Sequence, residues 1–232
     1  MNILGVIPAR GGSKEVPRKN LLKIGNKSLI ELATNSANKS KLLTRFLLSS
    51  DDDEIIEEGK KVGCPVYFKR PSELATDKSS TFSVIKHTVS WLSETEQWNP
   101  EIVVILQPTT PFRKAHHIDG VLDLLINSKA DAVITIRKPD YPPQWMLKLG
   151  NEKKLKNLIK GGNQYKRRQD TPLAYQPAGT AYAFRTHLLY EIDTLFPFKD
   201  TRGYVVKNEE AINIDTYNDY QMAKIIYEKN VK

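Results

Sequence analysis

The chain has 232 residues, of which 40% are hydrophobic and 27% charged, so one α/β domain over residues 1–232 is expected. One cysteine excludes an intrachain disulfide and suits a cytoplasmic protein, and the longest apolar run, residues 102–106, is too short to cross a membrane. The net charge of +8 is spread along the chain without a nucleic-acid-binding signature, which favours a phosphate-rich metabolite over nucleic acid as the partner.

Apolar segments of strand character alternate with helical patterns along the chain. Residues 50–53, Ser-Asp-Asp-Asp, supply caps for a helix that ends near Gly63, and Thr216 with Asp219 forms a capping box for the last helix. Apolar positions at helical spacing predict further helices over 29–37, 82–92 and 118–125. Strands are expected over residues 2–8, 45–49, 66–68, 102–106, 132–136 and 211–214.

This alternation predicts an α/β fold with a mainly parallel sheet and helices on both of its faces. The segment 139–172 interrupts the pattern, because it is rich in proline, glycine and charged residues. It is interpreted either as an inserted arm that contacts another subunit or as a long surface loop.

The segment IPARGGSKEVPRKN, residues 7–20, follows the first expected strand. It is not a Walker loop, because Lys14 follows Ser13, and no glycine triplet fits the G-x-G-x-x-G pattern of dinucleotide-binding loops. Gly11 and Gly12 would let backbone N–H groups approach phosphate oxygens, while Arg10, Lys14 and Lys19 add positive charge. The segment therefore predicts a phosphate-binding loop at the carboxyl end of a strand.

The same segment resembles the signature of the CMP-sialic acid synthetases, or acylneuraminate cytidylyltransferases. Three further blocks agree in order and spacing: KRPSELATDKSST (69–81), VILQPTTPFR (104–113) and KRRQDTPLAY (166–175) followed by INIDT (212–216). The resemblance covers nearly the whole chain. It implies a Rossmann-like fold with a dimerisation arm, which would be 139–172, and a homodimer.

The resemblance implies transfer of CMP from CTP to the anomeric oxygen of a 2-keto acid sugar, with release of pyrophosphate, for surface glycan synthesis. It implies catalytic roles for Arg10, Lys14, Lys19 and Asp215. The nucleotide would be bound by Arg10, Gly11, Gly12, Ser13, Asn20, Arg70, Ser79 and Thr81. For the Arg70 block, a helix N-cap serine beside a surface arginine is the simpler alternative.

Gln107 and Thr109 follow the apolar run 102–106, at the strand end where open α/β sheets bind ligands, so we expect them to contact the sugar. Strand termination by the neighbouring prolines is the alternative. The resemblance adds Arg168 and Tyr182 to the sugar site. Mg²⁺ is expected because CTP carries about four negative charges, and Asp215 matches the metal-binding aspartate of the family.

Four positions depart from the family pattern. Asn213 stands where many sialic acid enzymes have a second aspartate, and Glu15 places an acid beside the phosphates. Gln176 and Ala178 replace a basic residue and an amide of some relatives. Three of these changes fall on the metal or sugar side, which indicates an acceptor other than N-acetylneuraminate.

Three other functions stay open at the level of sequence. The chain could use another nucleotide, such as GTP, with a sugar 1-phosphate, or it could bind nucleotide without catalysis. A nucleic-acid-binding protein is supported by net charge alone. The four histidines show no zinc-site spacing and Cys64 has no histidine near it in sequence, so neither predicts a catalytic site.

Overall fold

In a computed structural model, which describes residues 1–191 and 199–231, the main sheet has the strand order β10-β6-β9-β5-β1-β4. β1 pairs in parallel with β4 and β5, β6 pairs in parallel with β10, and β9 runs antiparallel between β5 and β6. The predicted mainly parallel sheet is therefore confirmed. Its strands are β1 (Ile3–Pro8), β4 (Arg45–Ser49), β5 (Ile102–Ile105), β6 (Ala132–Arg137), β9 (Gln176–Arg185) and β10 (Thr201–Val205).

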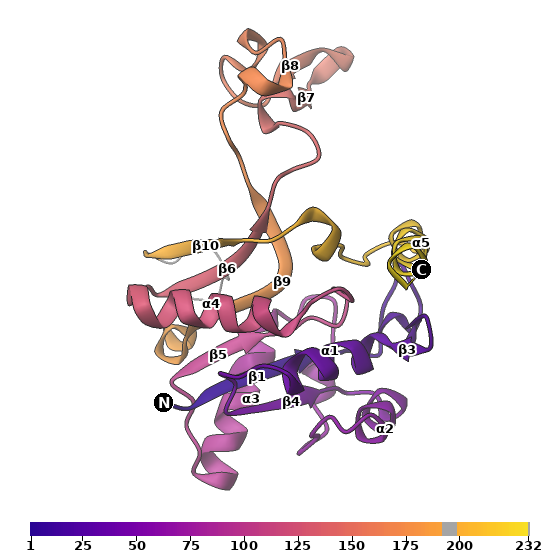
Figure 1. Cartoon of the computed structure of the whole chain (residues 1–232), viewed down its shortest axis with the longest axis vertical. Coiled ribbons are helices and arrows are strands. Elements are labelled where there is room, and N and C mark those ends of the chain that lie inside the picture. Colours follow the sequence, from indigo (N-terminus) through magenta and orange to yellow (C-terminus); the bar gives the residue numbers. More distant parts are fainter. Residues whose placement is uncertain (192–198, 232) are drawn as a thin grey trace.

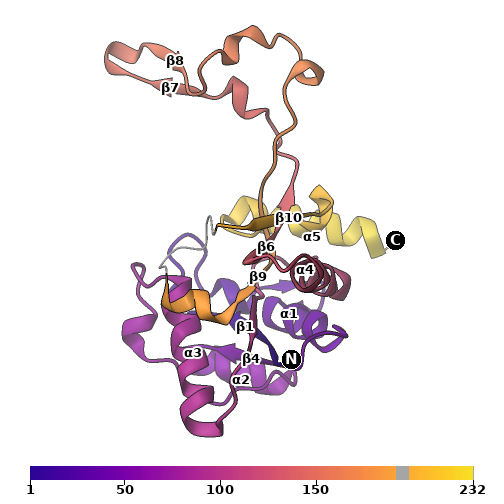
Figure 2. The same ribbon diagram turned by 90° about the vertical axis from the view of Figure 1, so that its left-hand side faces the viewer.

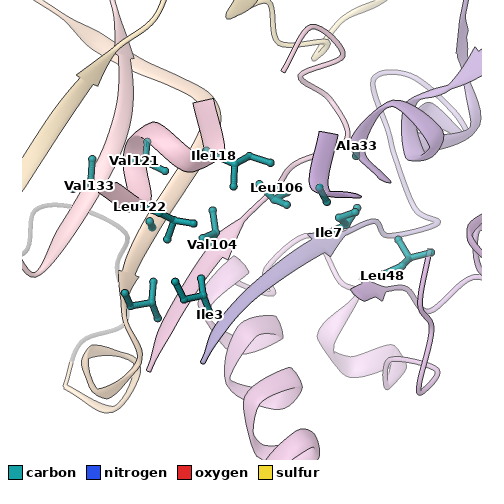
Figure 3. Packing of buried hydrophobic residues seen from close by; sticks show 14 of the residues in the cluster. Ile3, Ile7, Ala33, Leu48, Val104, Leu106, Ile118, Val121, Leu122 and Val133 are labelled. Atoms are coloured by element: carbon teal, nitrogen blue, oxygen red, sulfur yellow. The ribbon is translucent and has the colours of Figure 1, made fainter. Parts of the chain in front are cut away.

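Helices cover both faces of this sheet, as predicted (Figure 1). They are α1 (Leu29–Asn38), α2 (Asp53–Lys61) and α4 (Ala115–Ser128) on one face and α3 (Thr81–Glu96) on the other. Because neighbouring side chains of a strand point to opposite faces, β1 serves both layers. Ile3 and Ile7 pack in the cluster that contains α1 and α4 (Figure 3), whereas Leu4 and Val6 pack with Phe82 of α3.

The last helix, α5 (Tyr217–Val231), begins at the predicted capping box. The Asp219 carboxylate accepts the backbone N–H of Thr216 at 2.7 Å, and the Thr216 hydroxyl accepts the N–H of Asp219 at 3.2 Å. The helix packs through Ala223 against a small hairpin of β2 (Lys23–Ile24) and β3 (Lys27–Ser28). This contact brings the segment before α5 close to the loop that follows β1.

Two predicted strands are wrong. Residues 66–68 run beside β4, but Tyr67 and Phe68 pack on Trp91 of α3 instead of pairing as a strand. In residues 211–214 the apolar side chains of Ala211 and Ile214 pack in two different clusters, and Ile214 donates a single backbone hydrogen bond to the Thr109 carbonyl at 2.8 Å. Apolar pattern alone does not distinguish such packed irregular segments from strands.

The segment predicted as an arm projects away from the sheet between β6 and β9 (Figures 1 and 2). It contains a short antiparallel hairpin of β7 (Leu147–Leu149) and β8 (Leu155–Asn157). Its role in subunit contact stays a prediction. Across residues 1–191 and 199–231, no helix has the length and apolar character needed to span a bilayer.

Candidate active site

A polar cavity of about 590 Å³ lies beyond the carboxyl ends of β1 and β5, where open α/β sheets bind ligands. Four segments that are distant in sequence form its walls: the loop after β1, the stretch from Arg70 to α3, the loop after β5, and the segment before α5. Most predicted site residues line it, namely Arg10, Ser13, Lys14, Lys19, Asn20, Arg70, Ser79, Thr81, Gln107, Thr109 and Asp215. The first three sequence blocks and the INIDT part of the fourth therefore converge on one cavity.

Two predicted phosphate-binding cations meet an acidic residue that the sequence did not single out. Arg10 and Lys14 contact the two carboxylate oxygens of Asp77 at 3.1 and 2.5 Å. The hydrogen bond from Lys14 is the main reason that the pKa of Asp77 lies below its usual range. Asp77 thus pairs with two of the cations that a triphosphate would need. Glu15, the acid noted in the sequence of the loop, lines the same cavity.

The two glycines of the loop have different surroundings from those expected. A Cβ on Gly11 would lie 2.6 Å from a carboxylate oxygen of Asp52, and the Gly11 N–H already donates to Asp51 at 3.2 Å. The close approach of Asp52, the N-cap of α2, is therefore what requires a glycine at position 11. An open phosphate site is not the reason. A Cβ on Gly12 would meet no heavy atom within 4 Å, and neither glycine lines the cavity.

Arg18 fixes the loop from outside the cavity. Its guanidinium holds Asp52, the N-cap of α2, at 2.6 and 3.2 Å and also contacts Glu54. At the loop's inner edge, the buried Asn20 side chain donates to the Arg10 carbonyl at 3.0 Å. The Asn20 contact positions the backbone of Arg10, which lines the cavity. The charge of Arg18 is paired with Asp52 and Glu54 outside the cavity.

The second wall contains one buried cation. Arg70 is 4% exposed and pairs with Asp51 at 3.0 Å, and burial is the main reason that its pKa is lowered. The predicted alternative of a surface arginine is therefore wrong. Ser79 accepts the N–H of Thr76 at 3.1 Å, whereas the N-cap of α3 is Ser80, so Ser79 is not that helix cap. Thr81 is the first residue of α3.

Arg113, within the block VILQPTTPFR, holds the third wall in place and was not assigned a role from sequence. Its guanidinium is fully buried and donates to the carbonyls of Gln107 and Thr180, both at 3.0 Å, and to the hydroxyl of Ser36 at 3.1 Å. Burial lowers the pKa of Arg113 to about 9, so the side chain stays charged at neutral pH. It ties the Gln107 loop to α1 and β9.

The fourth wall carries the predicted metal ligand. The Asp215 carboxylate is 66% exposed, contacts Lys19 at 3.3 Å and accepts from the Asn213 amide at 2.6 Å. The Asn213 Oδ1 atom is buried, and it finds no hydrogen-bond partner in the described part of the chain. One carboxylate and one unsatisfied amide oxygen thus lie together, and both are oxygen ligands of the kind that Mg²⁺ binds.

A second cavity of about 610 Å³ adjoins the first, and Gln107, Asn213 and Asp215 line both. Tyr182 lines this second cavity, and its hydroxyl accepts the N–H of Gly179 at 2.9 Å. Gln176 and Ala178, two departures from the family pattern, also line it. The predicted sugar residues are therefore divided, with Gln107 between the cavities, Thr109 in the first and Tyr182 in the second.

Arg168 does not join the other predicted sugar residues. It lines a separate hollow of about 250 Å³ at the base of the arm, and its guanidinium donates to the Pro139 carbonyl at 3.3 Å. Arg167, its neighbour, pairs with Asp170 at 2.9 Å on the surface of the arm.

A buried histidine anchors the segment that leads to Asp215. His117 accepts the backbone N–H of Lys114 at its Nδ1 atom, so its Nε2 atom carries the proton toward Glu210, 3.2 Å away. Glu210 also pairs with Lys114 at 2.7 Å. Although His116, His117 and Glu210 lie close enough for a metal site, these contacts already use the ligand atoms of His117 and Glu210.

We expect stability to fall on acidification because of His117. Burial is the main reason that its pKa is lowered from 6.5 to about 4, so between these values the unfolded chain binds more protons than the folded one. The free energy of unfolding should drop by about 2 kcal/mol between pH 7 and pH 5 from this residue alone.

Urea unfolding at both pH values measures this loss. His117→Gln should reduce the pH dependence, whereas the same change at the exposed His187 should not. An unchanged pH slope in the His117 variant would show that this group does not titrate as described.

An α/β sheet with a polar, cation-lined cavity beyond its strand ends is typical of enzymes that bind nucleotides. The chain belongs to the cytidylyltransferase family, whose sequence model matches residues 4–231. It is therefore a nucleotidyltransferase, and the family expected from IPARGGSKEVPRKN is confirmed.

Relatives that match nearly the whole of this chain agree with this assignment. The chain is 30% identical to a pseudaminic acid cytidylyltransferase of Campylobacter jejuni, over 99% of this chain and 98% of the relative. It is 28% identical to an N-acylneuraminate cytidylyltransferase of Escherichia coli, over 98% of this chain and 52% of that longer protein. A solved CMP:2-keto-3-deoxy-manno-octonic acid synthetase complexed with CTP, 16% identical, covers 99% of this chain and 100% of its own with a TM-score of 0.73, which supports the fold.

Proposed function

We propose that this enzyme transfers CMP from CTP to the anomeric oxygen of a nonulosonate, a 2-keto acid sugar, and releases pyrophosphate. The observation that carries the proposal is the pair of adjoining cavities with Gln107, Asn213 and Asp215 at their boundary. The first would hold CTP and the second the acceptor, so that the acceptor oxygen meets the α-phosphate at this boundary. Two relatives are named as cytidylyltransferases of pseudaminic acid and of N-acylneuraminate, and these names support this acceptor class.

In this proposal the cationic wall of the first cavity binds the triphosphate. Arg10 and Lys14 would exchange Asp77 for phosphate oxygens, and Lys19 of the same loop would approach beside Asp215 of the fourth wall. Fixed cations at these positions stabilise the negative charge that develops on the α-phosphate and on the leaving pyrophosphate. Arg70, Ser79 and Thr81 would hold the nucleotide from the second wall.

The residues at the boundary fit a magnesium ion. Asp215 would supply a carboxylate oxygen and Asn213 its unsatisfied Oδ1 atom, and waters and phosphate oxygens would complete the shell. When bound, the ion would neutralise phosphate charge. Lys19 and Asn213 already orient the Asp215 carboxylate through their contacts at 3.3 and 2.6 Å.

The acceptor is tested by pyrophosphate release with CTP, Mg²⁺ and a panel of 2-keto sugar acids that includes N-acetylneuraminate, pseudaminic and legionaminic acids. Because Asn213, Gln176 and Ala178 all line the second cavity, we expect fastest release with an acid other than N-acetylneuraminate. Fastest release with N-acetylneuraminate would reject this divergent acceptor but not the reaction class.

The arm is proposed to hold two copies of the chain together. Its exposed side chains include Tyr141, Trp145, Met146, Leu147, Leu149, Leu155 and Leu158, between 39% and 73% exposed. An apolar surface of this kind on a projecting hairpin is costly in water and is relieved when a second copy covers it. The same contact would bring Arg168 close to another subunit.

Leu149→Glu combined with Leu155→Glu should convert the dimer to a monomer, because each change places a charge on the proposed apolar contact. Light scattering after size-exclusion chromatography measures the mass. Ile225→Glu, at a residue of α5 that is 48% exposed, is the matched control and should stay dimeric. A monomeric unmodified protein, or a double variant that remains dimeric, would reject the proposed role of the arm.

A further inference from the structure

The second cavity contains one cationic side chain among its described residues, although its proposed ligand is an acid. Its charged lining consists of Arg137, Asp140, Asp215 and Asp219. Three carboxylates disfavour a further anion unless a cation faces it directly. Arg137 is the cationic side chain placed to do so, and it was not singled out from the sequence.

The geometry of Arg137 suits a carboxylate. Its NH1 and NH2 atoms contact the two carboxylate oxygens of Asp140, each at 3.1 Å, in the two-pronged arrangement that arginine forms with carboxylates. The Arg137 side chain is 19% exposed, so the pair is partly shielded from water, whereas the side chain of Asp140 is 65% exposed. Asp140 is therefore the more easily displaced partner.

The sheet fixes the backbone that carries this guanidinium. Arg137 is the last residue of β6 and pairs with Gln176 of β9 across the antiparallel register, at the base of the arm. The hydrogen bond from Arg137 is the main cause of the lowered pKa of Asp140, and Arg168 of the arm contributes to it as well. Asp140 thus lies under the influence of two arginines.

We propose that Arg137 binds the carboxylate of the acceptor sugar acid and that Asp140 holds the same two N–H groups until the acceptor displaces it. The proposal rests on the proposed function and names a specificity-determining residue for it. The exchange replaces one carboxylate by another, so the guanidinium is paired before and after binding. An acceptor that lacks the negative charge cannot replace Asp140 in this way.

The test compares the best acceptor acid of the panel with its methyl ester, which removes the charge but keeps the anomeric hydroxyl. The unmodified enzyme should prefer the acid by about 30-fold in kcat/KM, the size expected for hydrogen bonds to a charged group. Arg137→Met should remove most of this preference and leave the KM for CTP within about twofold, because Arg137 lies outside the first cavity.

Arg202→Met is the matched control, since Arg202 pairs with Asp200 through two contacts of 3.1 Å on β10, outside both cavities. Asp140→Asn leaves Arg137 intact, removes its competitor and should lower the KM for the acid but not for the ester. This second variant keeps the test decisive if Arg137→Met does not fold.

The outcomes separate the two proposals. Turnover by the unmodified enzyme together with an unchanged acid preference in Arg137→Met, or an unchanged acid KM in Asp140→Asn, would overturn the role of Arg137 alone. No pyrophosphate release from the unmodified enzyme with any acid would overturn the proposed function and this inference with it.

Discussion

Asp215→Ala is expected to lower kcat at least about 1000-fold, because the proposed site would lose its one carboxylate ligand for Mg²⁺ at the boundary of the two cavities. The exposed position of Asp215 makes large loss of stability unexpected. Pyrophosphate release at saturating CTP and acceptor measures kcat, and urea unfolding checks the fold.

Asp123→Ala, on the exposed side of α4, is the control and should retain full activity. Asn213→Asp should lower the Mg²⁺ concentration that gives half-maximal rate, because an amide oxygen becomes a carboxylate. Substantial turnover by Asp215→Ala under the same Mg²⁺ concentration would contradict the assignment of the metal site.

Arg10→Ala is expected to lower kcat/KM for CTP about 100-fold, the loss expected when one fixed donor to a developing anion is removed. Arg10 and Lys14 contact the two oxygens of the same Asp77 carboxylate, so the Arg10 variant removes one of the two cations at this place. Steady-state kinetics with varied CTP at saturating acceptor measure the change.

Arg18→Ala provides the matched control from the same loop. Its guanidinium contacts Asp52 and Glu54 outside the cavity, so this variant should lose stability through the N-cap of α2 but keep kcat/KM for CTP per folded molecule. Asp77→Asn should lower the KM for CTP, because it removes the anion that occupies Arg10 and Lys14. Equal losses in the Arg10 and Arg18 variants would show that the loop acts only through the fold.

Much of the sheet could be predicted because its strands are short apolar runs. Apolar spacing and capping residues such as Asp52 and Thr216 predict β1, β4, β5 and β6 and each of the α-helices in the described part of the chain. β9 and β10 were not, because they contain small residues and glycines whose strand character depends on neighbours distant in sequence.

The members of the first cavity could be predicted from the family resemblance, but their partners could not. Asp77 and Arg113 act through contacts with residues 6 to 77 positions away, and Arg137 lies across a strand pair from Gln176. No local pattern encodes this placement. The reason for a glycine at position 11 could not be predicted either, because it is the contact with Asp52, the N-cap of α2. The location of Arg168 could not be predicted, because it depends on the position of the arm, which apolar spacing does not determine.

The most direct test of the account is the identity of the products formed from CTP, Mg²⁺ and the best acceptor acid. The account predicts one pyrophosphate for each acceptor molecule that gains the mass of CMP, with no such product from GTP. Turnover of GTP with a sugar 1-phosphate in the absence of any CTP-dependent product, or nucleotide binding without turnover of any acid, would contradict it.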